Sequence, residues 1–330
     1  MKKILIPLAL AATTALVSAN ASATSANYYI CTTNGCSNGG SATVSGSSAA
    51  TRYPIILAHG LAGFNQIGPI DYFYHIPSNL TANGAKVYET QVSSFNNIST
   101  RGPQLLSQVR TVLALTGAAK VNLMGHSQGA TDVRYVAAAI PSQVASVSTV
   151  GGVNKGSAVA DVLSGLFNIP GVGTLSKTVV ASITDAFFGF IDMWSGASYE
   201  QNAKAALAQL TTANMISFNN TYPAGVPSSS CGSGAASVNG VSYYSWSGGS
   251  HITTVIDASD EFLALTGLAF GSLTNDGMVG SCESHLGTVI GDNYDMNHLD
   301  EVNQIIGLTS STNPITLFVN QANRLKNAGL

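Results

Sequence analysis

A serine flanked by glycines lies near the middle of the chain, in residues 125–129 (GHSQG). This segment matches the pattern G-x-S-x-G, follows a short apolar run and precedes a helical pattern. In a strand–turn–helix context of this kind the serine occupies a sharp, strained turn, which projects its hydroxyl above the sheet. The pattern predicts that Ser127 is a nucleophile. The alternative interpretation is a glycine-rich turn without chemistry.

A serine hydroxyl becomes an effective nucleophile when a neighbouring base accepts its proton. In this context the acid and the histidine follow the serine in the chain, and the histidines after Ser127 are His251, His285 and His298. Asp276 lies in a turn-forming N-D-G sequence, and His298 precedes an apolar helical run. We predict that His298 is the general base and then the general acid, with Asp276 supporting its imidazole. Spacing favours this pair but leaves His285 with Asp276 open.

The tetrahedral intermediate of acyl transfer carries an oxyanion that backbone N–H groups must stabilise. Gln128, directly after the serine, would supply one donor. The loop at 59–63 (HGLAG) would supply the other through Leu61, because Gly60 lets this loop bend close to the nucleophile. The structural interpretation is preferred for His59 and His126, which we expect to orient loops rather than to transfer protons.

Elements that could position these groups alternate along the chain. Apolar runs predict strands at 53–58, 86–90, 121–124, 144–150 and 241–246, and apolar spacing predicts helices over 105–113 and 132–139, a helical insertion at 160–220 and a mostly helical tail at 297–330. Alternation of strands and helices predicts an α/β fold with a mostly parallel central sheet flanked by helices. We expect one catalytic domain over 51–330.

The first fifty residues differ in composition from the rest. A charged start, an apolar run at 4–17 and small residues at 19–23 predict a secretory signal peptide over 1–23, cleaved after Ala23 or alternatively after Ala21. The apolar run is short for a membrane span. Residues 24–50 carry almost no large apolar side chain, which predicts a flexible N-terminal extension. We therefore expect a secreted, extracellular protein.

The chain contains four cysteines, an even number suited to an oxidising compartment. Proximity favours the pairs Cys31–Cys36 and Cys231–Cys282, although the sequence permits three connectivities.

Charged residues make up 9% of the chain, and the formal net charge is −3. This composition offers no basic patch and argues against nucleic acid as a partner.

Several motifs together resemble the bacterial true lipases of the Pseudomonas type, lipolytic family I. They are residues 53–60 (YPIILAHG), 125–129, 275–280 (NDGMVG), 297–304 (NHLDEVNQ) and 321–327 (QANRLKN). The resemblance spans about 52–330. The first two motifs are shared by many hydrolases, whereas the later ones are more specific to this family. It implies an α/β-hydrolase fold and a triacylglycerol lipase that cleaves esters of water-insoluble acylglycerols at a lipid–water interface. It also implies Ser127, Asp276 and His298 as the triad, with Leu61 and Gln128 as oxyanion donors.

The resemblance further implies a structural calcium site near the catalytic histidine. The matching ligands are the carboxylates of Asp257 and Asp300 and the backbone carbonyls of Gln304 and Leu308, with Asp260 as the alternative to Asp257. Carboxylate and carbonyl oxygens suit a hard cation. Without the resemblance, these acids could equally be surface residues. The family's disulfide falls on Cys231–Cys282, and its members typically need a lipase-specific foldase during export.

Apolar residues recur at mostly helical spacing over about 171–194. The resemblance places a mobile lid here, which would cover the serine in water and open at an oil surface; the plainer interpretation is an ordinary buried helix.

A short-chain carboxylesterase or a polyester depolymerase would use the same triad with a different groove. A secreted binding protein without catalysis is the alternative of another class, and it would not need all three triad residues.

Overall fold

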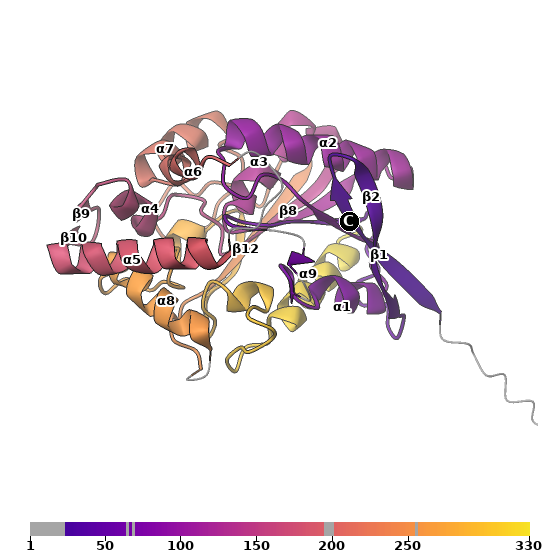
Figure 1. Ribbon diagram of the computed structural model, residues 1–330. Helices are drawn as coiled ribbons and strands as arrows, with labels where there is room; N and C mark the ends of the chain where they lie inside the picture. The colour runs from indigo at the N-terminus through magenta and orange to yellow at the C-terminus, as the bar shows by residue number, and fades with distance from the viewer. Residues whose placement is uncertain (1–23, 64–65, 68–69, 195–200, 255–256) are drawn as a thin grey trace, which may run out of the picture.

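A mostly parallel sheet forms the centre of the molecule (Figure 1). The computed structural model describes residues 24–330 except 64–65, 68–69, 195–200 and 255–256, so the predicted signal peptide lies outside the described residues. The sheet strands are β1 (Ser25–Thr32), β2 (Gly35–Thr43), β3 (Ile55–Ala58), β6 (Val87–Thr90), β7 (Val121–His126), β8 (Val144–Val150), β11 (Ser237–Val238), β12 (Val241–Gly248) and β13 (Thr288–Tyr294). β3, β6, β7 and β8 are buried along their whole length. β3 is a continuous apolar run, and the other three strands combine apolar residues with buried polar ones, as strands covered on both faces can.

The order of the strands places the candidate loops at one edge of the sheet. Among the described residues the order is β11-β12-β8-β7-β3-β6-β1-β2, and β13 also pairs with β12. β3, β6, β7, β8 and β12 run parallel to their neighbours within this group. The loops after β3, β7 and β8 therefore leave the sheet on the same side, where a site in such a fold is expected.

Helices cover both faces of the sheet. They are α1 (Ile76–Ala82), α2 (Ile98–Thr116), α3 (Gly129–Ala139), α4 (Ala158–Leu163), α5 (Lys177–Trp194), α6 (Ala203–Gln209), α7 (Thr212–Thr221), α8 (Ala258–Gly267) and α9 (Pro314–Asn327). On one face, Leu105 of α2 and Val133 of α3 pack in one apolar cluster with Ile56 of β3. On the other face, Phe318 of α9 packs in a second cluster with Leu57. The sheet is thus the middle of three layers (Figure 1).

The predicted strands and the helix at 132–139 agree with the structure in type and lie within a few residues of β3, β6, β7, β8, β12 and α3, whereas the helix predicted over 105–113 is longer and spans α2. The helical insertion at 160–220 contains α4 to α7 together with the short pair β9 (Asn168–Ile169) and β10 (Gly173–Thr174). The tail is helical mainly in α9. β13 and the small pair β4 (Gln66–Ile67) and β5 (Ile70–Asp71) were not predicted. No helix within the described residues is long and apolar enough to cross a membrane.

Residues 24–50 are not a flexible extension, and the domain does not begin at residue 51. β1 and β2 form an antiparallel hairpin, and β1 extends the sheet by pairing in parallel with β6. Tyr29 stacks on Tyr88 with ring centroids 5.2 Å apart, and Cys31 is fully buried. The composition misled the prediction because backbone groups can pair with a sheet edge while few apolar side chains contribute.

Both predicted disulfides are present. Cys31–Cys36 closes the turn between β1 and β2. Cys231–Cys282 joins the loop before β11 to a segment 51 residues further along the chain. A crosslink over this separation restricts the unfolded chain more than a short one does, so it is expected to contribute more to stability.

Candidate active site

Ser127 lies in the turn between β7 and α3. Its φ of 55° is in the left-handed region, where a residue with a side chain is strained. A Cβ at Gly125 would come within 2.9 Å of the Ala130 backbone nitrogen, and a Cβ at Gly129 within 2.8 Å of the His59 carbonyl oxygen. The two glycines of the motif therefore allow the tight bend that presents the serine, which is 7% exposed.

The loop after β3 lies directly against this serine. A Cβ at Gly60 would lie 2.6 Å from the Cβ of Ser127, so the close approach requires glycine. Leu61 shares a small cavity with Ser127. Among the hydrogen bonds of the described residues, none is donated by the backbone N–H of Leu61 or of Gln128. Both groups are thus available as donors at the positions that the sequence predicted.

A buried ion pair holds this loop from beneath. Arg101 of α2 pairs with Asp132 of α3 at 2.7 Å, and both side chains are fully buried. The guanidinium also donates to the carbonyls of His59 (2.7 Å), Gly60 (3.2 Å) and Ser93 (2.6 Å). Sequence reasoning missed this pair. The available signal was a charged residue on each of two otherwise apolar helix faces, in a chain where charges are rare.

Two buried histidines connect the loops, as the sequence interpretation expected. The ring of His59 contacts the Gly60 carbonyl (2.9 Å) and accepts from the Val92 backbone N–H (3.2 Å). Nε2 of His126 donates to the His298 carbonyl (3.0 Å), so its Nδ1 accepts from the hydroxyl of Tyr72 (2.6 Å). Burial lowers the pKa of His59 to about 3 and that of His126 well below its usual range. Both rings therefore stay neutral and hold structure rather than carry protons.

Asp276 and His298 form a close pair next to the serine turn. Nδ1 of His298 lies 2.8 Å from Oδ2 of Asp276, whose other oxygen accepts from the backbone N–H groups of Met278 (2.8 Å) and Val279 (2.7 Å). The ring of His298 lies against the ring of His126, with centroids 4.6 Å apart. Met278 and Val279 line the cavity that contains Ser127. With Nδ1 bonded to the carboxylate, Nε2 of His298 is the ring atom that can accept a proton.

His285 lies in a different environment from the one that its alternative role requires. Its Nδ1 contacts the Gly232 carbonyl (2.9 Å), and its Nε2 lies 3.0 Å from Oδ2 of Asp292. Both ring nitrogens are used in contacts beside the Cys231–Cys282 disulfide, so the geometry favours His298 as the partner of Asp276.

Glu301 is a second buried acid beside the histidines that sequence reasoning did not single out. Its Oε2 lies 3.2 Å from Nε2 of His126 and 3.7 Å from Nδ1 of His298. Its Oε1 accepts from the Gly248 N–H at 2.6 Å. Burial, followed by the charge of Asp276, raises the pKa of Glu301 well above its usual value. A second negative charge beside Asp276 is therefore disfavoured. The only available signal was its position three residues after His298.

Two of the predicted metal ligands, Asp257 and Asp300, lie close to each other, and Asp300 follows His298 by two residues. Asp257 and Asp300 are buried rather than surface acids, and one oxygen of each, together with Oε1 of Gln304, has no hydrogen-bond partner. The backbone carbonyls of Gln304 and Leu308 accept no hydrogen bond from the described residues. By contrast, both carboxylate oxygens of Asp260 accept hydrogen bonds. The donor set therefore fits a cation through Asp257 better than through Asp260.

The cavity beside Ser127 is nearly closed. It measures about 20 Å³, and Phe187 of α5 lines it together with Leu61, Leu207 and Met278. Phe187 and its neighbour one turn earlier, Ile183, are almost fully buried, whereas Phe188 is 48% exposed. Sites that hold small molecules usually measure about 300–1,000 Å³. An acyl chain thus cannot enter unless α5 or its neighbours move.

Known proteins similar to this chain are hydrolases. A family model described as the alpha/beta hydrolase fold matches residues 53–257. A triacylglycerol lipase of Vibrio cholerae is 52% identical, over 85% of this chain and 89% of its own. A triacylglycerol lipase of Pseudomonas fragi is 44% identical over 86% and 99%. The crystal structure of a Bacillus licheniformis lipase, 19% identical, matches 78% of this chain and 89% of its own with a TM-score of 0.55, which is a likeness of fold.

Proposed function

This chain belongs to the bacterial triacylglycerol lipases, which are serine ester hydrolases of the α/β-hydrolase fold, and from that premise we propose that Ser127, His298 and Asp276 are its catalytic triad. The observation that carries the proposal is the 2.8 Å contact between His298 and Asp276, made beside the strained turn of Ser127. A secreted binding protein would have no use for this combination of a buried acid, an oriented imidazole and a strained serine.

The mechanism follows from these positions. Oγ of Ser127 attacks the ester carbonyl while Nε2 of His298 accepts its proton, and Asp276 stabilises the imidazolium. The oxyanion that forms accepts hydrogen bonds from the N–H groups of Leu61 and Gln128. His298 then gives its proton to the leaving alcohol, and the acyl group remains on the serine. A water molecule then attacks the acyl carbonyl while His298 accepts its proton. The bond to Oγ of Ser127 breaks, His298 gives the proton to Oγ, and the fatty acid leaves.

A serine-directed alkyl phosphonate tests the triad. We expect the protein to be labelled stoichiometrically, and Ser127→Ala to abolish both labelling and ester hydrolysis. His298→Ala should slow labelling strongly, whereas His285→Ala should leave the labelling rate close to that of the wild type. Labelling that depended on His285 rather than on His298 would refute the assignment of the base.

We further propose that α5 is a lid over an acyl site and that substrates reach this site at a lipid–water interface. In support, α5 buries Ile183 and Phe187 beside the serine and exposes Phe188, and the cavity beneath it is too small for an acyl chain. Opening would be a population shift that lipid favours, because apolar side chains would then meet lipid rather than water. This interpretation favours long-chain acylglycerols over the dissolved substrates of a short-chain esterase.

The discriminating assay compares an emulsified long-chain triacylglycerol with a dissolved short-chain ester. A lipase with a lid should gain activity sharply when the substrate forms an interface, whereas a simple esterase should follow substrate concentration alone. A polyester depolymerase would be recognised by release of soluble products from a polyester film at a rate that exceeds its rate on triacylglycerol.

We also propose that Asp257 and Asp300, with the carbonyls of Gln304 and Leu308, hold a structural calcium ion. The support is the set of buried oxygens without hydrogen-bond partners, which suits a hard cation. Bound there, the ion would offset two buried negative charges. Asp300 lies two residues after His298, so an ion that held the Asp300 carboxylate in place would also hold the segment that carries the proposed base. Membership of the lipase family implies no organic cofactor.

Export is the last part of the proposal. The signal-like start and the two disulfides support a secreted, extracellular protein. The family resemblance supports a lipase-specific foldase as a partner during export. Expression with and without a foldase from a related lipase operon tests this partner: active enzyme that accumulates equally in both cases would exclude the dependence.

A further inference from the structure

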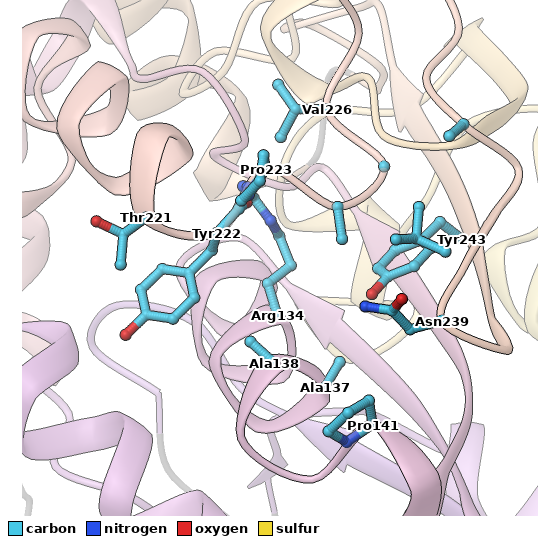
Figure 2. A pocket seen from close by; sticks show the side chains of 14 residues that line it. Arg134, Ala137, Ala138, Pro141, Thr221, Tyr222, Pro223, Val226, Asn239 and Tyr243 are labelled. Carbon is cyan, nitrogen blue, oxygen red and sulfur yellow. The ribbon is translucent and has the colours of Figure 1, made fainter.

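A second cavity, of about 320 Å³, lies at the carboxyl-terminal end of α3, whereas Ser127 precedes the amino-terminal end of the same helix. It lies between α3, the loop after α7 and the hairpin of β11 and β12. In Figure 2, side chains from α3 rise on one side, and Asn239 and Tyr243 face them from the hairpin. Its walls are mainly apolar, and they include Ala137, Ala138, Pro223, Val226 and Val238.

Arg134 is the single charged side chain among the residues that line this cavity. It is 3% exposed and forms no ion pair with any described residue. Its guanidinium donates to oxygens of Asn154, Asn219 and Tyr222, all of them neutral, and its Nε has no hydrogen-bond partner. The Cζ atom lies over the ring of Phe218, 4.8 Å from its centroid, so the cation has an aromatic neighbour but no anion. A buried cation without a counter-charge is costly, so an anion that entered the cavity would be stabilised.

Other polar groups at the cavity can complete the binding of an anion. Tyr243 is 3% exposed, and Asn239 stands at the exposed turn between β11 and β12 (Figure 2). A tyrosine hydroxyl and an asparagine amide both donate hydrogen bonds. Burial lowers the pKa of Arg134 to about 9, which still leaves the guanidinium protonated at neutral pH. The lining residues include no carboxylate that could compete for it.

We propose that this cavity binds a fatty acid of short or medium chain length, with its carboxylate directed to Arg134 and its alkyl chain along the apolar wall. The volume lies at the lower end of the range for small-molecule sites, about 300–1,000 Å³, which excludes a long chain held in full. One cation among apolar walls matches a monoanion with an alkyl tail. The chemistry of the site is independent of the proposed catalytic residues, and only the source of the ligand, ester hydrolysis, rests on the proposed function.

The experiment uses the full secreted chain with Ser127 blocked by an alkyl phosphonate, so that the acyl site is already occupied. Isothermal titration with sodium octanoate, below its micelle concentration, should show one remaining site. Octanamide, which has the same shape without the charge, should bind at least ten times more weakly. Equal affinity for the two compounds, or no binding of octanoate, would overturn the proposal.

Substitutions locate the bound octanoate. Arg134 itself holds three segments through its hydrogen bonds, so its removal would also disturb the fold. Ala138→Phe instead fills the cavity from α3 and should weaken octanoate binding at least tenfold. Ala139→Phe is the matched control, because Ala139 is the next residue of the helix, is exposed and does not line the cavity. Octanoate binding that is unchanged in Ala138→Phe would also refute the site, while failure of the phosphonate to label Ser127 would count against the triad alone.

Discussion

The reacting groups depend on a residue that contributes no side chain at all. Gly60 lies so close to Ser127 that a Cβ there would be 2.6 Å from the Cβ of the serine and 2.9 Å from the hydroxyl of Tyr72. Gly60→Ala should therefore displace the oxyanion loop and lower kcat roughly 100-fold or more, as loss of an oxyanion donor does. The measurement is hydrolysis of a dissolved short-chain ester. Gly189→Ala, at a helical position with open space around it, should retain activity.

Glu89 of β6 carries a pH prediction. It is fully buried, and burial, followed by the charge of Asp71, raises its pKa well above the usual value of 4.5. The folded chain therefore keeps a proton that the unfolded chain releases as pH rises. Below the pKa that Glu89 has in the unfolded chain, the side chain is protonated in both states and costs no stability. As pH rises from that value toward the higher pKa of the folded chain, the free energy of unfolding falls by up to about 1.4 kcal/mol per pH unit.

Glu89→Gln should remove this loss. Urea unfolding at pH 4.5, 6 and 8 should show the variant gaining stability relative to the wild type as pH increases. The exposed Glu261→Gln serves as control and should follow the wild-type curve. If the stabilities of Glu89→Gln and of the wild type changed in parallel with pH, Glu89 would have to be charged in the folded state.

The proposed catalytic residues could be singled out from the sequence because their motifs are local. G-x-S-x-G surrounds Ser127, and Asp276 lies within its own turn sequence. Spacing favoured His298 over His285, and the family resemblance strengthened that preference. Arg101 and Glu301 were missed because their sequence signals, a rare charge on an apolar helix face and an acid three residues after His298, do not show which residues they contact in the fold. A buried ion pair or a buried carboxyl group leaves no periodic pattern in the chain.

Two helices and the oxyanion loop are joined by the pair of Arg101 and Asp132. Asp132→Ala would leave the guanidinium buried without a counter-charge and should destabilise the protein by about 3–5 kcal/mol in urea unfolding. The double change Arg101→Met with Asp132→Leu should recover much of this stability. It should not recover activity, because no group would then hold the carbonyls of His59 and Gly60. Arg110→Met, on the exposed face of α2, is the control that should change neither quantity.

The lid assignment of α5 can be tested with two adjacent residues of opposite exposure. Phe187→Ala would open the closed cavity beside Ser127 and should raise the rate on a dissolved short-chain ester several-fold. Phe188→Ala should leave that rate unchanged and lower the rate on emulsified triacylglycerol, because Phe188 is exposed where the lid would meet lipid. If Phe187→Ala and Phe188→Ala changed the rates on both substrates in the same way, α5 would be an ordinary structural helix rather than a lid.

On the scale of the molecule, the central sheet was predictable because its buried strands are short segments rich in apolar residues that alternate with helical patterns. The edge hairpin of β1 and β2 was not, since it is held by backbone pairing and a disulfide and carries small polar residues on most positions. The hairpin lengthens the sheet beyond β6. The second cavity was also beyond sequence reasoning, because α3, the loop after α7 and β12 come together only in the folded chain.

Calcium would connect distant parts of the whole fold, and its removal should affect stability before chemistry. Asp257 precedes α8, and Asp300 follows His298, so an ion between them would tie two segments together. Chelation should lower the Tm, and restoring calcium at a hundredfold excess over its Kd should return about 2.7 kcal/mol. Asp300→Asn should have a lower Tm and should lose the response to chelator. Asp292→Asn, an acid with a 45% exposed side chain away from the proposed ligands, should keep it. A wild-type Tm that is indifferent to both chelator and calcium would show that the unpartnered oxygens of Asp257 and Asp300 hold no ion that contributes to folding.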